Sequence, residues 1–285
     1  MYTRPVGPLE SRSALLEDPI GEYFKIEETL VKEEQWEEII QKSKAPLAEA
    51  IKINRHSAAA NIYFQRTSAF FKLGKYIEAR ENALCCDKLM QSIENPILVI
   101  QALYLKSAVY RALASKELEP KAKQEMFLQA VEIAESACQI YTEKSVENEN
   151  LLGKVFFNLG AAHADNPHGD LQEAEHCYQN ALKFFKNSGS FEEEVRTNVR
   201  LGKIYLIKKD YSFLKELIHE ARATILPDRL TMHIDYLEAQ YLLAIGDCEN
   251  GERVTKSGLS RAICLRAEED QLRFNVLLQE IIERQ

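Results

Sequence analysis

The stretch Leu201-Gly202-Lys203-Ile204-Tyr205 opens the register that decides the fold. Counted from Gly202, small, apolar and aromatic residues recur at fixed offsets: Tyr205 at +3, Tyr211 at +9, Leu214 at +12, Ile218 at +16 and Ala221 at +19. Steps of 3 and 4 place residues on one face of a helix. Small residues in both halves let two helix backbones approach closely, so the register predicts a helical hairpin.

The register recurs along the chain. Copies start at Thr67 and Ala239, and two further copies start at Gly160 and Ser107 if the turn between the helices lengthens. In the Ser107 copy the extra residues fall in the charged stretch 115–123, which we expect to form an exposed connection. A single hairpin cannot bury its own apolar face, so the hairpins must stack on one another.

This pattern resembles the tetratricopeptide repeat (TPR) family over about residues 58–262. The residues that carry the resemblance are Asn158-Leu159-Gly160 with Ala174, Tyr178 and Ala181, and Leu201-Gly202 with Tyr205, Tyr211 and Ala221; Lys72 to Ala79 resembles the family's turn between helices. The copies start at residues 67, 107, 160, 202 and 239, so the spacing exceeds the usual 34 residues. Members with long helices and irregular periods are therefore the nearer comparison. The resemblance implies an all-α, right-handed superhelical solenoid that binds peptides or partner proteins on its concave face.

The predicted organisation has three parts. A flexible tail at 1–18 precedes a TPR-like domain at 19–266, and a capping helix at 267–285 closes it. The hairpins are expected near 20–53, 58–90, 97–142, 150–187, 190–225 and 229–264. Asn95-Pro96 and Ser190, with Glu193 three residues on, have the pattern of helix starts.

Composition limits the function. The net charge of −8 disfavours a nucleic-acid binder, which needs a cationic surface. The longest nearly apolar run, Ile97–Leu105, is too short to span a bilayer, and no signal-peptide core follows Met1. We therefore expect a cytoplasmic protein, in a host cytosol if it is a secreted bacterial protein.

No local motif indicates catalysis or a cofactor. The chain has no phosphate-binding loop and no dinucleotide or nucleophile-elbow motif. The six cysteines form no C-x-x-C pair, and His163, His168 and His176 lack metal-ligand spacing. We expect neither a metal nor an enzyme activity.

The main candidate binding site is a basic ridge. Arg196 and Arg200 are four residues apart on one helical face, and Lys203 follows one turn later. Asn158 lies on the first of the two helices of the preceding hairpin. The resemblance implies that Asn158 forms a hydrogen bond with the backbone of a bound peptide, while the arginines hold a carboxylate. The family's carboxylate clamp also uses a Lys and an Asn four residues apart on the preceding first helix, and residues 104–108 do not supply that pair, so a different acidic or extended segment is the expected ligand. The alternative is a solvated helix face on which Glu192–Glu194 pair with the arginines.

Five further polar residues on first helices either bond a peptide or are simply polar surface: Asn61, Gln65, Gln101, His233 and Gln240. The predicted function is non-catalytic binding of a partner protein or extended peptide, with the ridge selecting acidic groups. One alternative is a dedicated chaperone, or a regulator or inhibitor, of one protein such as a secreted bacterial effector. Another is a sensor that responds to a peptide or small molecule.

Overall fold

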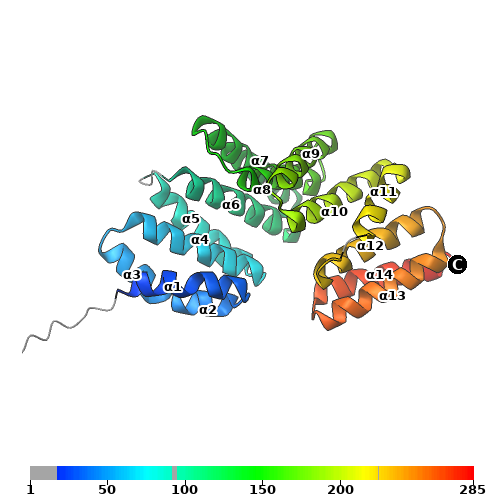
Figure 1. Cartoon of the computed structure of the whole chain (residues 1–285), viewed down its shortest axis with the longest axis horizontal. Helices are drawn as coiled ribbons and strands as arrows, with labels where there is room; N and C mark the ends of the chain where they lie inside the picture. The colour runs from blue at the N-terminus through cyan, green and yellow to red at the C-terminus, as the bar shows by residue number, and fades with distance from the viewer. Residues whose placement is uncertain (1–17, 92–94, 224) are drawn as a thin grey trace, which may run out of the picture. The chain divides into compact units, whose positions relative to one another are not determined.

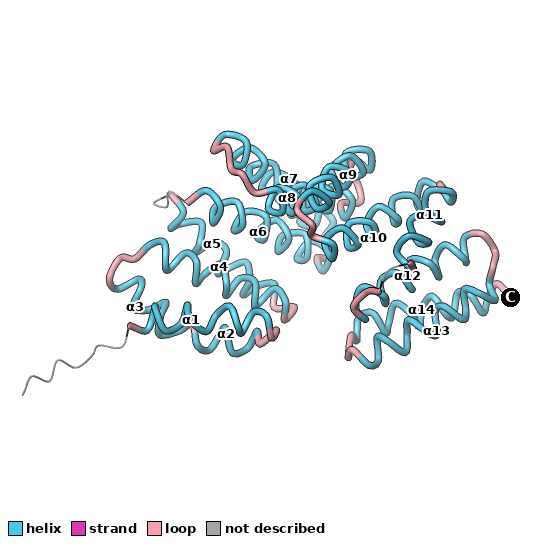
Figure 2. Tube along the Cα trace, in the orientation of Figure 1, coloured by secondary structure: helices cyan, strands magenta, loops and turns pink. Residues whose placement is uncertain are grey.

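The computed structural model describes residues 18–91, 95–223 and 225–285, which form helices and no strand. The tail expected at 1–18 lies outside the described residues, apart from Asp18. The chain divides into two compact units between Glu94 and Asn95, where a single repeat domain was expected. Figure 2 shows short loops between consecutive helices in each unit.

The first unit contains five helices: α1 (Pro19–Lys32), α2 (Trp36–Lys42), α3 (Lys44–Lys52), α4 (His56–Lys72) and α5 (Tyr76–Met90). The hairpin expected near 20–53 is three helices, because Pro46 lacks the N–H that would continue α2. The expected turn after α4 is confirmed. There Gly74 has a φ of 71°, a left-handed conformation that glycine adopts without strain.

The second unit contains the remaining helices: α6 (Pro96–Lys116), α7 (Pro120–Glu143), α8 (Glu149–Asp165), α9 (Leu171–Asn187), α10 (Phe191–Lys208), α11 (Tyr211–Arg222), α12 (Asp228–Ala244), α13 (Cys248–Cys264) and α14 (Glu268–Glu283). The first helices of the hairpins, α6, α8, α10 and α12, each pack on the next of the series, and α14 packs on α12 (Figure 1). The second helices, α7, α9, α11 and α13, pack against the helices that precede them. We call the side of α6, α8, α10, α12 and α14 that faces away from the second helices the first-helix face.

Two helix starts in this unit agree with the sequence. Asn95 caps α6, because its side-chain oxygen accepts hydrogen bonds from the backbone N–H groups of Ile97 and Leu98. Helix α10 begins after Ser190, as expected, but the hydroxyl of Ser190 makes no capping bond. It instead accepts a hydrogen bond from the amide of Asn150 on α8.

The small residues of the register lie where helices approach closely. A Cβ atom added to Gly160 would lie 3.0 Å from the ring of Tyr178 on α9. At Gly202 an added Cβ would overlap Leu237 of α12 and lie 3.2 Å from Leu214 of α11. Glycine therefore sets the distance between helices at both positions, as the repeat pattern predicts.

The expected exposed connection at 115–123 is wrong. Helix α6 runs to Lys116 and α7 begins at Pro120, so only residues 117–119 connect them. Pro120 presets the backbone of the first helical turn, and the carboxylate of Glu119 accepts a bond from the N–H of Ala122. The extra residues therefore lengthen two helices instead of forming a loop.

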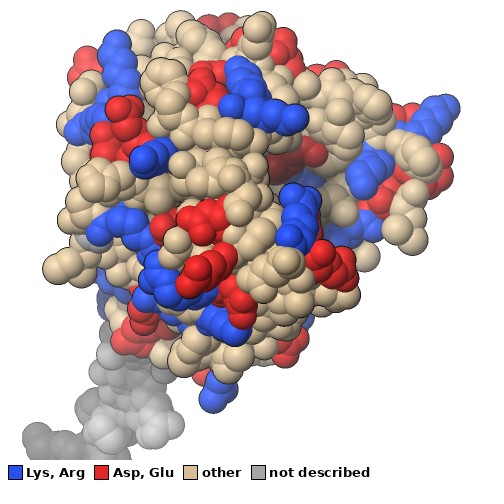
Figure 3. Space-filling view, turned by 90° about the vertical axis from the view of Figure 1, so that its right-hand side faces the viewer, with Lys and Arg blue, Asp and Glu red and all other residues tan. Residues whose placement is uncertain are grey.

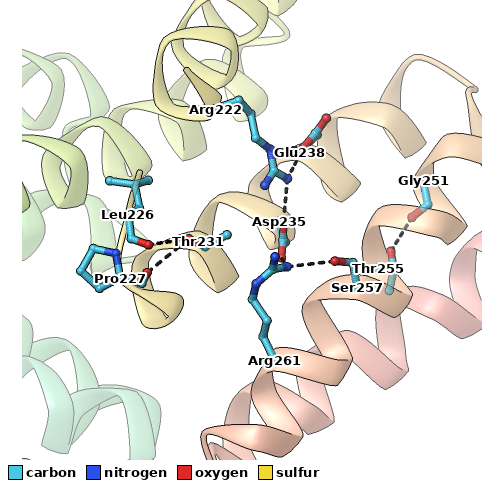
Figure 4. A network of polar contacts seen from close by, with 10 residues as sticks. All are labelled: Arg222, Leu226, Pro227, Thr231, Asp235, Glu238, Gly251, Thr255, Ser257 and Arg261. Atoms are coloured by element: carbon cyan, nitrogen blue, oxygen red, sulfur yellow. Dashed lines mark hydrogen bonds and ion pairs between the residues drawn. The ribbon is translucent and has the colours of Figure 1, made fainter. Parts of the chain in front are cut away.

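A buried carboxylate joins three helices of the second unit. Asp235 on α12 is 1% exposed and pairs with Arg222 of α11 and with Arg261 of α13, each at 2.6 Å (Figure 4). Arg222 also pairs with Glu238. The shared carboxylate holds α11 and α13 against α12.

By length and composition alone, α6 could cross a membrane. It packs against α7 and α8, and eight of its residues are buried in the protein. A core helix passes the same test, so α6 is weak evidence of a membrane span.

Candidate functional site

An ion-pair junction joins three of the first helices, α6, α8 and α10. Asp165, the last residue of α8, pairs with Arg111 of α6 at 2.5 Å and with Arg200 of α10 at 2.8 Å. The Arg111 side chain is 11% exposed, whereas those of Asp165 and Arg200 are about a third exposed. One carboxylate thus serves two guanidinium groups, and the junction keeps a net positive charge.

Asn158 lies beside this junction, buried in α8 with 3% of its surface exposed. Its side-chain oxygen accepts a hydrogen bond of 3.1 Å from Nη2 of Arg111. Its amide nitrogen has no partner among the described residues, and neither do Nε of Arg111 and the hydroxyl of Tyr178. Buried polar atoms in proteins are nearly always hydrogen-bonded, so these three atoms are exceptions, and each is enclosed by the protein with almost no surface open to solvent.

The electrostatics of the junction follow from its geometry. Burial opposes ionisation of Asp165, but the charges of Arg200 and Arg111 outweigh it and hold the pKa of this carboxyl below its ordinary value. Burial likewise opposes the charge of Arg200, and the carboxylate of Asp165 reverses the effect and raises the pKa of Arg200. Burial raises the pKa of Tyr178 to about 12, so its hydroxyl stays protonated and able to donate.

The residues of the predicted ridge differ in their surroundings. Arg196 is exposed, with Nη2 3.8 Å from the carboxylate of Glu192, as in the alternative of a solvated helix face. Arg200 pairs across helices with Asp165, which neither interpretation anticipated. Lys203 is half-buried and makes no hydrogen bond or ion pair with any described residue.

The five further candidates are half-buried, and their side chains form no hydrogen bond with the described residues. Asn61 and Gln65 lie on α4 of the first unit, whereas Gln101 on α6 and His233 and Gln240 on α12 belong to the second. Within the second unit, His233 lies near Lys203, since the charge of Lys203 contributes to lowering the pKa of the imidazole.

Two residues of the junction, Arg111 and Asp165, were missed by the sequence reasoning. Arg111 lies four residues after Ser107, and Asp165 lies five residues after Gly160. Charges of opposite sign therefore occupy neighbouring places on successive first helices. That signal was available but was not used.

The part of the chain that the structure describes holds no group of three or more His, Cys, Asp or Glu residues placed to bind a metal ion. Burial raises the pKa of Cys86 and Cys177 to about 12 and that of Cys138 to about 11. These thiols stay protonated near neutral pH, which makes them poor nucleophiles. Figure 3 shows acidic and basic side chains interspersed on the visible face, without the broad basic surface that nucleic acid requires.

Comparison with known proteins shows the fold. No protein-family model and no curated protein sequence matches the chain. The similar solved structures include BtubC from P. vanneervenii (17% identity, covering 81% of this chain and 92% of that one, TM-score 0.57), RapI (12% identity, 93% and 98%, 0.59) and NprR in complex with its cognate peptide NprX (13% identity, 97% and 84%, 0.54). The predicted fold, an all-α TPR-like solenoid of helical hairpins, is confirmed.

Proposed function

We propose that the chain is a non-catalytic regulator that binds an extended peptide on the first-helix face of its second unit. The observation that carries this proposal is Asn158, a buried amide with a free donor on the face where successive first helices meet. A backbone carbonyl of a peptide could accept from that amide and from Nε of Arg111 once the side chains that enclose both atoms move aside. This would satisfy two buried donors together, which favours binding.

The similar fold of NprR supports the proposal, because that protein was crystallised with its cognate peptide and is described as a quorum sensor of B. thuringiensis. We also infer that the chain is a TPR relative with long helices and an irregular period, from the register and this fold. A cytoplasmic location stays a prediction, and nothing in the structure or in the compared proteins supports a host cytosol.

The two ends of the first-helix series are close in space. Lys116, at the end of α6, lies 3.6 Å from Glu269, near the start of α14. This exposed ion pair joins the end of α6 to the start of α14. A short segment is the ligand that we propose for this face, as in the sensor interpretation, in preference to a whole protein held by a dedicated chaperone.

The acidic preference expected of the ligand rests on Arg196 and Lys203. Arg200 is already paired, so its charge is shared with Asp165. A substitution Arg200→Glu would place two carboxylates together and disturb folding. Arg196→Glu is the cleaner test of the ridge, because Arg196 is exposed and forms only a long pair with Glu192.

The test uses a pool of random octapeptides, incubated with the full-length protein and identified by mass spectrometry after affinity capture. The variant Asn158→Leu removes the buried amide at similar volume. We expect it to retain the wild-type melting temperature within a few degrees and to lose peptide retention. Asn180→Leu on α9, which removes an amide bonded to His176 near the surface, is the matched control.

Capture of no peptide by the wild-type protein would refute the proposed function. Equal capture by wild type and Asn158→Leu would refute the assignment of the site. Circular dichroism of each variant separates loss of binding from loss of helix.

A further inference from the structure

Four side chains of the second unit form a continuous chain of hydrogen bonds across three helices. Arg200 of α10 donates to Oδ1 of Asp165 at 2.8 Å, and Arg111 of α6 donates from Nη1 to Oδ2 of the same carboxylate at 2.5 Å. Nη2 of Arg111 donates in turn to Oδ1 of Asn158 at 3.1 Å. The chain thus begins at Arg200, passes through Asp165 and Arg111, and ends at the side chain of Asn158, which is 3% exposed.

The direction of each bond in this chain is fixed by the chemistry of its members. A carboxylate only accepts hydrogen bonds and a guanidinium group only donates them, whereas the side chain of an Asn can do either. Arg111 can therefore bond only the oxygen of the Asn158 side chain. The amide nitrogen of Asn158 is left as the free end, so the chain presents a donor there.

Asp165 holds Arg111 in the position that this arrangement requires. Burial favours the neutral form of Asp165, but the charges of Arg200 and Arg111 outweigh it and keep the pKa of the carboxyl below its ordinary value, so the group is ionised at neutral pH. An arginine side chain has many rotamers and loses much conformational entropy when it is ordered. The short ion pair with Asp165 holds the guanidinium of Arg111, whose side chain is 11% exposed, at one place beside Asn158.

The end of the chain offers two donors. Nε of Arg111 is bonded to the same carbon as Nη2, and Nδ2 of Asn158 is bonded to the same carbon as Oδ1, so both nitrogens flank the hydrogen bond between Arg111 and Asn158. Both are buried and have no partner among the described residues. A ligand atom that accepts hydrogen bonds, such as a backbone carbonyl oxygen, complements this pair, whereas a backbone N–H does not.

We propose that Asp165 is a positioning residue of the peptide site, which through Arg111 turns the donor of Asn158 toward the ligand and so makes the site specific for a backbone carbonyl over a backbone N–H. This inference rests on the proposed function. Asp165 itself touches no ligand atom in this arrangement, because each of its two oxygens already accepts from an arginine. Its effect on binding is carried by Arg111 and Asn158.

The variant Asp165→Asn removes the charge and keeps the size of the side chain. A single carbonyl oxygen then replaces two carboxylate oxygens, so the side chain cannot accept from both arginines in the present geometry. Asp235→Asn is the matched control. Asp235 also pairs with two arginines of the second unit, each at 2.6 Å, and neither of them belongs to the chain that ends at Asn158.

The first readout needs no ligand. In nitrogen-15 NMR spectra of the whole chain, the two side-chain amide protons of Asn158 are assigned by their absence in Asn158→Leu. We expect both signals to be protected from exchange with solvent in wild type, to shift and lose that protection in Asp165→Asn, and to stay in place in Asp235→Asn. Unchanged Asn158 signals in Asp165→Asn overturn the inference. If Asp165→Asn does not fold, Arg111→Met removes the next link of the chain and should have the same effect.

The second readout is the affinity for an octapeptide selected from the random pool, measured by titration calorimetry well below the melting temperature of each variant. Because one hydrogen bond is worth about tenfold in affinity, Asp165→Asn should bind about tenfold more weakly than wild type, and Asp235→Asn should bind equally well. An equal loss in both variants would indicate weaker helix packing and overturns the inference, as does an undiminished affinity in Asp165→Asn. If wild type retains no peptide, it is the proposed function that fails, while the NMR readout still decides whether Asp165 orients Asn158.

Discussion

Replacement of Asp235 by Asn tests the network that joins α11, α12 and α13. The side chain of Asp235 is 2% exposed, and both arginines that it holds are 34% exposed. Removing one partner of a fully buried pair costs about 3–5 kcal/mol. Because about a third of each arginine side chain is exposed to water, we expect part of this loss to be screened, leaving a cost of about 2–3 kcal/mol.

The expected cost converts to a measurable shift. The unit that contains Asp235 runs from Asn95 to Gln285, and for a domain of this size a cost of 2–3 kcal/mol lowers the melting temperature by about 4–12 °C. Thermal and urea unfolding followed by circular dichroism measure it. Glu238→Gln is the matched control, since Glu238 also pairs with Arg222 but is 24% exposed. Its cost should stay below about 1 kcal/mol.

A companion variant separates lost charge pairing from lost packing. The triple substitution Asp235→Leu, Arg222→Met and Arg261→Met replaces the network by apolar side chains of similar size. Such replacements are often neutral or stabilising, so the triple variant should be more stable than Asp235→Asn. The reasoning is refuted if Asp235→Asn unfolds within about 0.5 kcal/mol of wild type, which is the ordinary range of surface substitutions.

Three further results are expected. The pKa of Asp165 is held low in the folded protein, so the stabilisation that this carboxylate provides is complete above the unfolded pKa of about 3.9 and is lost as pH falls through the folded pKa. Urea unfolding at pH 7 and pH 3 should therefore show that acid lowers the free energy of unfolding less in Asp165→Asn than in wild type. Gly202→Ala should destabilise by about 1–3 kcal/mol because its Cβ overlaps Leu237, whereas Gly251→Ala, whose nearest contact would be 3.5 Å, should stabilise α13 by up to about 1 kcal/mol. Equal effects of the two alanines would contradict the packing role of Gly202. Lys203→Met should raise the melting temperature of the free protein at pH 7, because the folded state disfavours the charged form of Lys203. For the same reason the stability of the wild-type protein should increase as pH rises through the Lys203 pKa of about 8. A lower melting temperature in Lys203→Met would show that Lys203 has a stabilising partner.

The sequence predicted the repeat because its signal is local. Small residues such as Gly160 and Gly202 occur where two helices of neighbouring sequence must approach, so their spacing survives in the chain. The helix boundaries of residues 56–91 and 95–283 largely follow from the spacing of these small residues. The first hairpin was less predictable, because Pro46 divides a segment whose apolar anchors fit one helix as well as two.

The candidate site was harder to predict because it depends on contacts between helices far apart in the sequence. Arg111 and Asp165 are 54 residues apart, and only their similar places in successive copies of the register join them. Arg196 and Arg200 share a helical face, yet Arg196 faces solvent and Arg200 reaches across to α8. A pattern of charges places residues on a face, but it does not identify the partner that each charge finds there.

The contact between Lys116 and Glu269 has a consequence for how the second unit unfolds. In an ordinary repeat array each repeat touches only its neighbours, so the ends can fray independently and the array behaves as a one-dimensional chain. Here the lengthened α6 reaches the terminal helix, and the array gains a link between its two ends. Because both side chains are about 60% exposed, salt weakens this link. Unfolding of the second unit should thus be most cooperative at low ionic strength, and added salt should let its terminal repeats open separately.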